Sequence, residues 1–175
     1  MNKEFVKLFI CPRCKLNNLK VGFKIFKLKK SKVSKNKGFL RCKKGHIFKI
    51  NNNIPNFIIK RKFESEIYDD VWKNNTLSKY KKKDIKFYKK KFQNFANIKK
   101  LNLKNKLVLD AGCGEGRFSW LLSNLGAKKV VAVDFSNTAL SRAKYQSANS
   151  NKIVFIKADL NNLPLIEDTF DLVIS

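Results

Sequence analysis

The chain has 175 residues, of which 43% are hydrophobic, and carries 39 basic against 13 acidic side chains, a formal net charge of +26. The hydrophobic share suffices for a packed core and excludes a wholly disordered chain. No apolar run reaches the roughly 18 residues of a membrane span, and the first ten residues lack the long apolar stretch of a signal peptide. We therefore expect a cytoplasmic protein with no membrane partner.

The charge is unevenly distributed along the chain. Residues 1–104 hold 31 basic and 6 acidic side chains, a net +25, whereas residues 105–175 hold 8 and 7, a net +1. This step predicts two parts with different functions. Lysine outnumbers arginine by 34 to 5, although phosphate recognition favours the bidentate arginine fork. A solvated surface that reflects compositional bias is therefore favoured over a functional basic face that binds RNA.

The amino-terminal part contains two patterns typical of metal ligands. Cys11 and Cys14 form a C-x2-C pair, and Cys42 and His46, the only histidine of the chain, form a C-x3-H pair. Three thiolates and one imidazole suit tetrahedral zinc at a structural site. A redox C-x-x-C pair and unrelated buried thiols are the alternatives. The KLNN that follows Cys14 does not indicate the strand-to-helix junction of a thioredoxin-like unit.

Apolar and polar residues alternate at 21–28 and 38–41, which predicts strands of a small β-ribbon. So small a unit buries little core, and bound zinc would supply the missing stability. The stretch from CPRCK through LRCKKGHIFKI to NNNIPNFI resembles the small zinc-ribbon domain that occurs as a methyltransferase activator subunit and fused in front of methyltransferases. NNIP at 52–55 replaces the family's Asp-Gly-Ile-Pro turn. The C-x3-H knuckle with Phe48 also resembles the zinc finger of rRNA guanine-N1 methyltransferases. These resemblances imply a zinc-ribbon-like domain at residues 1–59.

Residues 60–104 contain neither glycine nor proline and predict a helical connector. Ile85, Tyr88, Phe92, Phe95 and Ile98 follow helical spacing, with lysines between them. We expect this apolar stripe to pack on the neighbouring domain; contact of the basic face with RNA or lipid is the alternative. Upstream, Tyr68, Val71 and Trp72 indicate a second apolar face, in a lid near the ligand site of the next part.

From residue 106 onward, buried strands alternate with helices. A strand at 107–109 leads directly into DAGCGEG at 110–116, and a helical stripe then runs to Gly126. Glycines in such a turn let the backbone approach a ligand, and the amino terminus of the helix favours negative charge. Further strands are predicted at 129–133, 153–156 and 170–174, and the alternation indicates a parallel sheet.

The glycine-rich turn differs from two well-known nucleotide motifs. The dinucleotide fingerprint needs glycine where this chain has Arg117, and no Gly-Lys-Ser/Thr follows as in a Walker loop. Asp134 ends the second strand 18 residues after Gly116, where a carboxylate can accept both hydroxyls of a ribose. Simple capping of a strand end is the alternative for Asp134 and for Asp159.

Four blocks, LVLDAGCGEGRFSWLL, VVAVDFS, IKADLNNLPL and FDLVIS, resemble in order and spacing the motifs of class I S-adenosylmethionine-dependent methyltransferases. The resemblance covers residues 106–175 and implies a Rossmann-like α/β fold with S-adenosylmethionine as cofactor. It implies that Gly112, Gly114 and Gly116 lie against the methionine and ribose part. It further implies that Asp110 orients the loop and the amino group, Asp134 holds the ribose, Asp159 and the Leu160 backbone read the adenine, and Phe135 packs on it. Cys113 would be a small filler of the loop.

The predicted strands are the first four of the seven that a complete fold of this class has. The last would leave a buried-type edge exposed, so we expect residues 105–175 to be a truncated domain. No general base is apparent. The favoured hypothesis is a methyltransferase acting on a small molecule or biosynthetic intermediate. One alternative is an rRNA or tRNA methyltransferase whose basic zinc module docks RNA, and another is a non-catalytic zinc adaptor or degenerate remnant.

Overall fold

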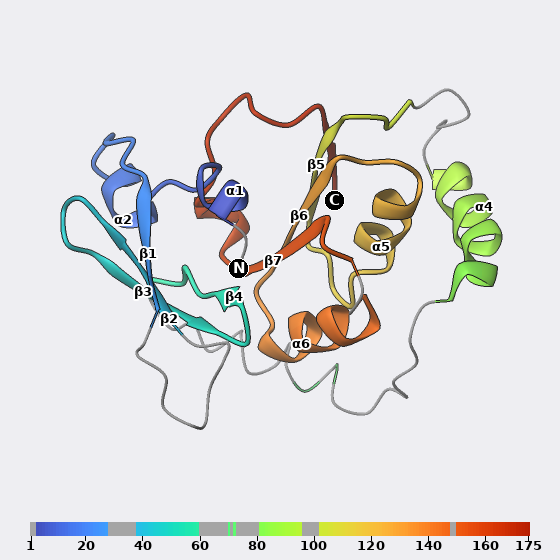
Figure 1. Cartoon of the computed structure of the whole chain (residues 1–175), viewed down its shortest axis with the longest axis horizontal. Coiled ribbons are helices and arrows are strands. Elements are labelled where there is room, and N and C mark those ends of the chain that lie inside the picture. The colour runs from blue at the N-terminus through green and yellow to red at the C-terminus, as the bar shows by residue number, and fades with distance from the viewer. Residues whose placement is uncertain are drawn as a thin grey trace.

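The computed structural model describes residues 3–27, 38–59, 70, 72, 81–95, 102–147 and 150–175. Two four-stranded sheets lie side by side, an antiparallel one built from the amino-terminal residues and a parallel one built from the carboxyl-terminal residues (Figure 1). The three helices at residues 85–95, 117–124 and 137–146 lie on the side of the parallel sheet that faces away from the antiparallel sheet (Figure 1). The fold is therefore α/β with a small β unit beside it, as the sequence predicts.

The antiparallel sheet belongs to what we call the amino-terminal module, residues 3–27 and 38–59. Its strands are hydrogen-bonded in the order β1-β2-β3-β4. Their bounds, with those of two short helices, are β1 (Phe23–Lys27), β2 (Gly38–Cys42), β3 (Ile47–Asn51), β4 (Ile54–Pro55), α1 (Lys3–Val6) and α2 (Pro12–Lys15). The first two strands correspond to the predicted ones, although β1 starts two residues later and β2 ends one residue later than predicted, and Leu28 lies outside the described residues. The sequence prediction omits β3 and β4.

The turn between β3 and β4 explains why the sequence departs from an Asp-Gly pair there. Asn52 and Asn53 both have positive φ angles, 49° and 58°. Asparagine tolerates this left-handed conformation better than other residues with a side chain. The two asparagines therefore make the turn without a glycine.

The parallel sheet has the strand order β7-β6-β5-β8. Its strands are β5 (Leu107–Ala111), β6 (Lys129–Asp134), β7 (Ile153–Lys157) and β8 (Leu172–Ile174). All four are predicted from the sequence, with ends that shift by one or two residues. Strand β8 lies at one edge of the sheet, where Val173 is 57% exposed.

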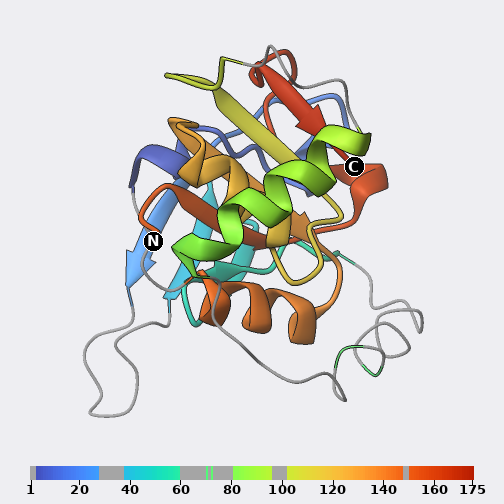
Figure 2. The same ribbon diagram turned by 90° about the vertical axis from the view of Figure 1, so that its right-hand side faces the viewer.

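One face of the parallel sheet is covered by α4 (Ile85–Phe95), α5 (Arg117–Asn124) and α6 (Asn137–Gln146). Figure 2 shows α4 crossing in front of α5 and the sheet. Ser136 caps α6 by accepting a hydrogen bond from the Ala139 amide at 3.0 Å. A short 3-10 helix, η1 (Lys82–Asp84), precedes α4. No helix within the described ranges is long and apolar enough to cross a membrane.

Part of the predicted connector cannot be compared with the structure. Helix α4 agrees with the predicted helix as far as Phe95, and Phe92 is buried against the helical layer. Ile98, Tyr68 and Val71 lie outside the described residues. The proposed domain limits 1–59, 60–104 and 105–175 remain predictions.

The amino-terminal module extends the parallel sheet beyond β7. The Phe57 amide donates to the carbonyl oxygen of Lys157 at 2.8 Å, within a parallel bridge between Asn56 and Lys157. In the turn between β3 and β4, the backbone and side-chain oxygens of Asn52 accept hydrogen bonds from the Lys144 ammonium on α6. The module thus occupies the open edge of the sheet.

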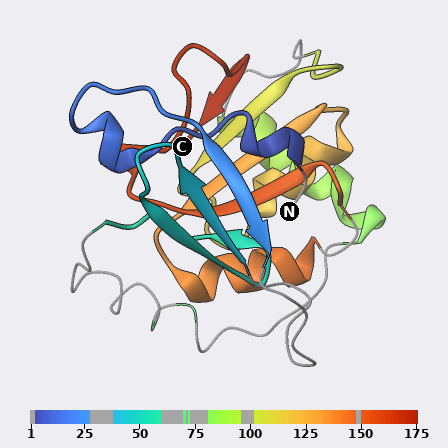
Figure 3. The ribbon, with the colours of Figure 1, turned by 60° about the vertical axis from the view of Figure 1, so that its left-hand side comes forward.

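The module shares its core with the parallel sheet. Phe5, Phe9 and Phe57 belong to one apolar cluster with Val131 and Ile156, which face the module from β6 and β7. Figure 3 shows the strands of the module lying across the parallel sheet. The sequence predicts a unit that depends on metal because it is too small to form a core. The structure adds a second source of stability, the burial of apolar side chains against the neighbouring sheet.

Candidate functional site

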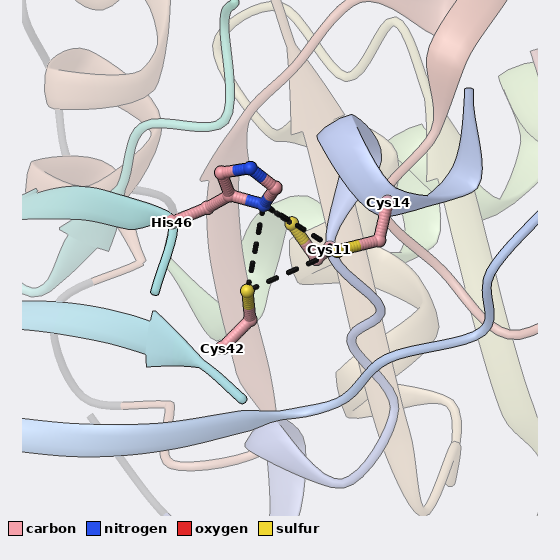
Figure 4. Close-up of side chains that lie close together, drawn as sticks. All are labelled: Cys11, Cys14, Cys42 and His46. Carbon is pink, nitrogen blue, oxygen red and sulfur yellow. Dashed lines mark hydrogen bonds between the residues drawn. The ribbon is translucent and has the colours of Figure 1, made fainter. Parts of the chain in front are cut away.

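Four predicted metal ligands converge in the amino-terminal module (Figure 4). The ligand atoms of Cys11, Cys14, Cys42 and His46 all lie within 4.8 Å of one another. His46 Nδ1 lies 3.5 Å from Cys11 Sγ, 3.4 Å from Cys14 Sγ and 3.6 Å from Cys42 Sγ, and the sulfurs of Cys14 and Cys42 are 3.9 Å apart. The structure therefore brings together all four residues of the predicted set.

These separations match the edges of a zinc tetrahedron. With Zn–S bonds of about 2.3 Å and Zn–N bonds of about 2.0 Å, two sulfurs would be about 3.8 Å apart and a sulfur and a nitrogen about 3.5 Å. The three cysteines are buried and the histidine is partly buried, which suits a closed structural site. The donor set thus fits zinc in both chemistry and spacing.

Local structure and burial affect the thiols of this cluster differently. Cys11 precedes α2, Cys14 lies in it, and Cys42 ends β2. Burial raises the pKa of Cys11 to about 12 and also raises the pKa of Cys14. Burial alone would raise the pKa of Cys42 too, but hydrogen bonds from the backbone at His46 and Lys44 hold it below its ordinary value. Backbone N–H groups that donate to the Cys42 sulfur stabilise its thiolate form, which is the form that binds a metal.

A second group of predicted residues lies at the carboxyl ends of β5, β6 and β7. We call it the strand-end site, and it comprises Asp110, Gly112, Gly114, Asp134, Phe135, Asp159 and Leu160. Its centre is Asp134, whose Oδ2 accepts from the Gly114 amide and whose Oδ1 accepts from the Ser136 amide, both at 2.8 Å. Asp134 thus ties the glycine-rich turn to the end of the neighbouring strand.

Asp110 is a buried carboxyl group beside Asp134. Asp110 is 4% exposed, and its Oδ2 accepts a hydrogen bond from the Ser119 hydroxyl at 2.5 Å. Burial raises the pKa of Asp110 to about 6, and the negative charge of Asp134 adds to this rise. Two carboxyl groups on adjacent strand ends give the site a negative potential, which suits a ligand with a cationic group.

The other predicted residues line the same edge of the sheet. A Cβ on Gly112 would lie 3.9 Å from Leu160 Cδ1, so the turn after β5 lies against the start of η3 (Leu160–Asn162). Asp159 caps η3 by accepting from the Asn161 amide at 2.9 Å. The Lys157 ammonium lies 5.8 Å from the centre of the Phe135 ring.

Gly116 differs from the other two glycines of the turn. A Cβ there would lie 2.8 Å from Ala143 Cβ and 3.1 Å from Phe155 Cε1, and its φ is +74°. The side of Gly116 that lacks a side chain therefore faces α6 and β7 inside the core. The structure gives this glycine a packing role, and its contact with a cofactor remains a prediction.

Two contributors to this region lie outside the predicted site residues. Arg142 Nε donates to Glu115 Oε1 at 2.6 Å, in an ion pair that links α6 to the glycine-rich turn. An arginine on the inward face of α6, next to Ala143, is the signal that could have indicated it. The Trp72 ring lies 3.2 Å from the position of a Cβ on Gly114, which agrees with the prediction that this residue lies near the ligand site.

Cys113 stays apart from the metal cluster. It is buried in the glycine-rich turn, and its thiol contacts the carbonyl oxygen of Gly114 at 3.7 Å. Burial raises its pKa well above the ordinary value. A buried, neutral thiol agrees with the predicted role as a filler.

Comparison with known proteins supports the interpretation of the strand-end site. Residues 108–175 match the model of a family described as a methyltransferase domain. The match starts in β5 and includes all residues of the strand-end site. Together with the strand order, it supports a Rossmann-like class I methyltransferase fold for this part of the chain.

Individual relatives carry different names. The chain is 36% identical over 78 residues to a ribosomal protein L11 methyltransferase of Legionella pneumophila (strain Corby), covering 45% of this chain and 27% of the relative. It is 37% identical over 76 residues to a tRNA U34 carboxymethyltransferase of Shewanella loihica, covering 42% and 23%. The chain thus spans about a quarter of the length of these curated relatives. A crystal structure of a putative S-adenosylmethionine-dependent methyltransferase from Listeria monocytogenes has a TM-score of 0.43 at 26% identity, covering 46% of this chain and 38% of that one.

Proposed function

We propose that this protein binds S-adenosylmethionine at the strand-end site and takes part in methyl transfer. The observation that carries the proposal is the arrangement of Asp110 and Asp134 on adjacent strand ends, with the amide of Gly114 bonded to Asp134 at 2.8 Å. A carboxylate in each position, with a glycine-rich backbone between them, suits a ligand that has both a ribose and a cationic amino acid part. The family match over residues 108–175 supports the same activity.

Each residue has a proposed task toward the cofactor. When bound, the cofactor supplies a methyl group on a cationic sulfur, ready for in-line displacement by an acceptor. Asp134 would accept hydrogen bonds from the ribose hydroxyls, using the carboxylate lone pairs that do not already accept from the Gly114 and Ser136 amides. Asp110 would attract the amino group of the methionine part. Asp159, the Leu160 backbone and Phe135 would hold the adenine, and no general base is assigned.

A titration tests the cofactor site without knowledge of the acceptor. S-adenosylhomocysteine should bind the wild-type chain in isothermal titration calorimetry, and Asp134→Asn should weaken binding at least about tenfold because a charge-assisted hydrogen bond contributes roughly 1.5–3 kcal/mol. Asp168→Asn is the matched control. Asp168 is exposed and has a positive φ of 53°, which asparagine also tolerates. No binding by the wild-type chain, or equal affinity in both variants, would overturn the assignment.

We also propose that zinc occupies the cluster of Cys11, Cys14, Cys42 and His46 in a structural role. The tetrahedral spacing of the four ligand atoms supports it. Elemental analysis should find one zinc per chain in the wild type, and none in Cys14→Ser. Cys113→Ser, at a buried cysteine outside the cluster, should keep the metal. Zinc retained at full occupancy in Cys14→Ser would contradict the proposal.

A small molecule or biosynthetic intermediate is the acceptor that the sequence favours, and RNA is the alternative. One feature of the structure favours RNA: six basic side chains line two neighbouring hollows on the amino-terminal module, namely Lys3, Lys7, Lys20, Lys24, Arg41 and Lys43. The third hypothesis, a non-catalytic zinc adaptor or degenerate remnant, predicts that the chain stabilises a partner protein without transferring a methyl group.

A further inference from the structure

Two hollows on the surface of the amino-terminal module adjoin each other at residues 22–24. The first has a volume of about 630 Å³ and the second about 580 Å³, and they share Gly22, Phe23 and Lys24. We call them together the basic groove. Its lining residues come mainly from α1, β1 and residues 41–43 at the Cys42 end of β2. Helix α1 and strand β1 lie beside each other (Figure 3). Its basic lining residues are Lys3, Lys7, Lys20, Lys24, Arg41 and Lys43.

The positive charge of the groove is largely uncompensated. Lys20 pairs with Glu167 at 3.3 Å, and Glu167 also pairs with Lys15 at 3.5 Å. For the other five basic residues, no ion pair is found in the described part of the chain. Like charges along one groove repel one another, and a polyanion would relieve this repulsion while releasing its own counterions.

The floor of the groove is apolar and includes an aromatic ring. Phe23 lies where the two hollows meet and is only partly buried, and Val6, Phe9 and Ile25 continue the floor. A basic rim over an apolar, aromatic floor is how proteins bind single-stranded nucleic acid, with phosphates on the cations and bases on the rings. The groove therefore fits a single strand better than a duplex.

The spacing of the basic residues, and not their type, favours nucleic acid over an acidic protein. Five of the six basic lining residues are lysines. This share equals that of the whole chain, in which 34 of 39 basic residues are lysines. Basic residues spread along the whole groove, instead of clustered at one end, match the regular charge of a phosphate backbone.

One segment connects the groove to the strand-end site. Ile166 lines the groove, and the backbone of residues 164–166 is bonded to residues 8–10 of the module, with the Ile10 amide on the carbonyl oxygen of Pro164 at 3.0 Å. The same segment begins at Leu160, which lies against Gly112. Residues 160–166 therefore join the groove to the edge where the methyl donor is proposed to bind.

We propose that the basic groove binds single-stranded RNA and thereby presents an RNA acceptor to the strand-end site. Binding to the groove is independent of the proposed function, whereas the role of the RNA as acceptor rests on it. The groove residues act on phosphates, so binding should be strong at low salt and only weakly dependent on sequence.

Fluorescence anisotropy tests the groove directly. The probe is a labelled oligouridine of about 15 nucleotides, near the upper end of the site size of a small single-strand-binding domain. The triple variant Lys7→Gln, Lys24→Gln, Lys43→Gln removes charge from the groove. The matched control removes the same charge from exposed lysines of α4, in Lys86→Gln, Lys89→Gln, Lys90→Gln. Circular dichroism and zinc content establish that both variants are folded.

The groove variant should bind the probe at least about tenfold more weakly, and the slope of log affinity against log salt should fall by about 2, at about 0.7 per lost phosphate contact. The control should lose less than about threefold. Equal losses in both variants would show that net charge alone drives binding and would overturn the proposal. Displacement of the probe by polyglutamate at equal charge concentration would overturn it in favour of an acidic protein partner.

A parallel titration keeps the two proposals separate. S-adenosylhomocysteine should bind the groove variant with wild-type affinity, because none of the three lysines belongs to the strand-end site. The RNA titration is run without cofactor. Loss of RNA binding with intact cofactor binding therefore supports the groove, and intact RNA binding with no cofactor binding refutes only the proposed function.

Discussion

Arg142 on α6 holds Glu115, the residue between the second and third glycines of the turn, in a nearly buried ion pair. Arg142 Nε and Glu115 Oε1 are 2.6 Å apart, and the two side chains are 7% and 16% exposed. Gln146 Nε2, one helical turn further on, lies 3.5 Å from the other carboxylate oxygen of Glu115. A charged residue inside the glycine-rich turn is thus fixed to the helix that follows the neighbouring strand.

This pair predicts a strong coupling between the two positions. Removing one partner leaves a buried charge without its counter-ion, so Arg142→Gln should lower the free energy of unfolding by about 3 kcal/mol. The double variant Arg142→Gln, Glu115→Gln should recover part of that loss, because the stranded carboxylate is also removed. Urea denaturation of the four members of the cycle measures the coupling, which should be about 1–3 kcal/mol. If the losses in unfolding free energy of the two single variants simply added up in the double variant, the two residues would not be energetically coupled.

The raised pKa of Asp110 predicts a pH dependence of stability. In the folded chain its pKa is about 6, against an ordinary value of 3.8. The folded state binds this proton more tightly than the unfolded state, so protonated Asp110 stabilises the fold. This contribution to the free energy of unfolding is fully present below about pH 4 and is lost as the pH rises through about 6. At pH 7 the ionised, buried carboxylate costs up to about 3 kcal/mol.

Asp110→Asn removes this titration. We expect the variant to be more stable than the wild type at pH 7.5 by about 1–3 kcal/mol, and the difference to shrink or reverse at about pH 4. Urea denaturation at the two pH values measures it. The same variant should bind S-adenosylhomocysteine more weakly, because it lacks the charge proposed to attract the amino group. A stability difference that does not change with pH would contradict the raised pKa.

Gly116 and Gly45 illustrate two different reasons why a position requires glycine: a positive φ angle and a lack of space for a side chain. Both have positive φ angles, 74° and 87°, but a Cβ on Gly116 would lie 2.8 Å from Ala143, whereas a Cβ on Gly45 would meet nothing within 4 Å. Gly45→Ala should therefore cost only the backbone strain, about 1 kcal/mol. Gly116→Ala should cost about 2–4 kcal/mol, because overpacking of the core adds to the strain. Equal losses in chemical denaturation would mean that the core accommodates the methyl group.

Much of this architecture follows from patterns that are local in the sequence. The strands β5, β6 and β7 are runs of apolar residues, and the caps and glycines beside them have local causes, as at Ser136. The four metal ligands are recognised by spacing within two short segments. For such elements, neighbours along the chain carry most of the information.

The relationships that the sequence does not indicate join residues far apart in the chain. The bond from the Phe57 amide to Lys157 and the ion pair between Arg142 and Glu115 depend on how finished elements pack. No local pattern marks Phe57 as a strand partner, because the bond uses only its backbone. The shared core of the module and the parallel sheet is invisible for the same reason: apolar residues predict burial without naming the surface that covers them.

Trp72 offers an optical test of ligand binding at the strand-end site. Its ring lies 3.2 Å from the place where Gly114 would carry a Cβ, while Trp120, the other tryptophan of the chain, is buried under the helical layer. A ligand that approaches the glycine-rich turn must change the surroundings of Trp72. Adding S-adenosylhomocysteine should therefore shift or quench the tryptophan fluorescence of the wild type.

Substitution of each tryptophan in turn assigns this signal. The change on adding S-adenosylhomocysteine should be absent in Trp72→Phe and present in Trp120→Phe, because the ring of Trp72 lies beside Gly114 whereas Trp120 is buried within the helical layer. Gly114→Ala should alter the emission of Trp72 without any ligand, since the added methyl group is closer to the ring than an ordinary contact allows. Calorimetry on Trp72→Phe separates loss of signal from loss of binding. A fluorescence change that persists undiminished in Trp72→Phe would mean that the ligand binds away from Gly114.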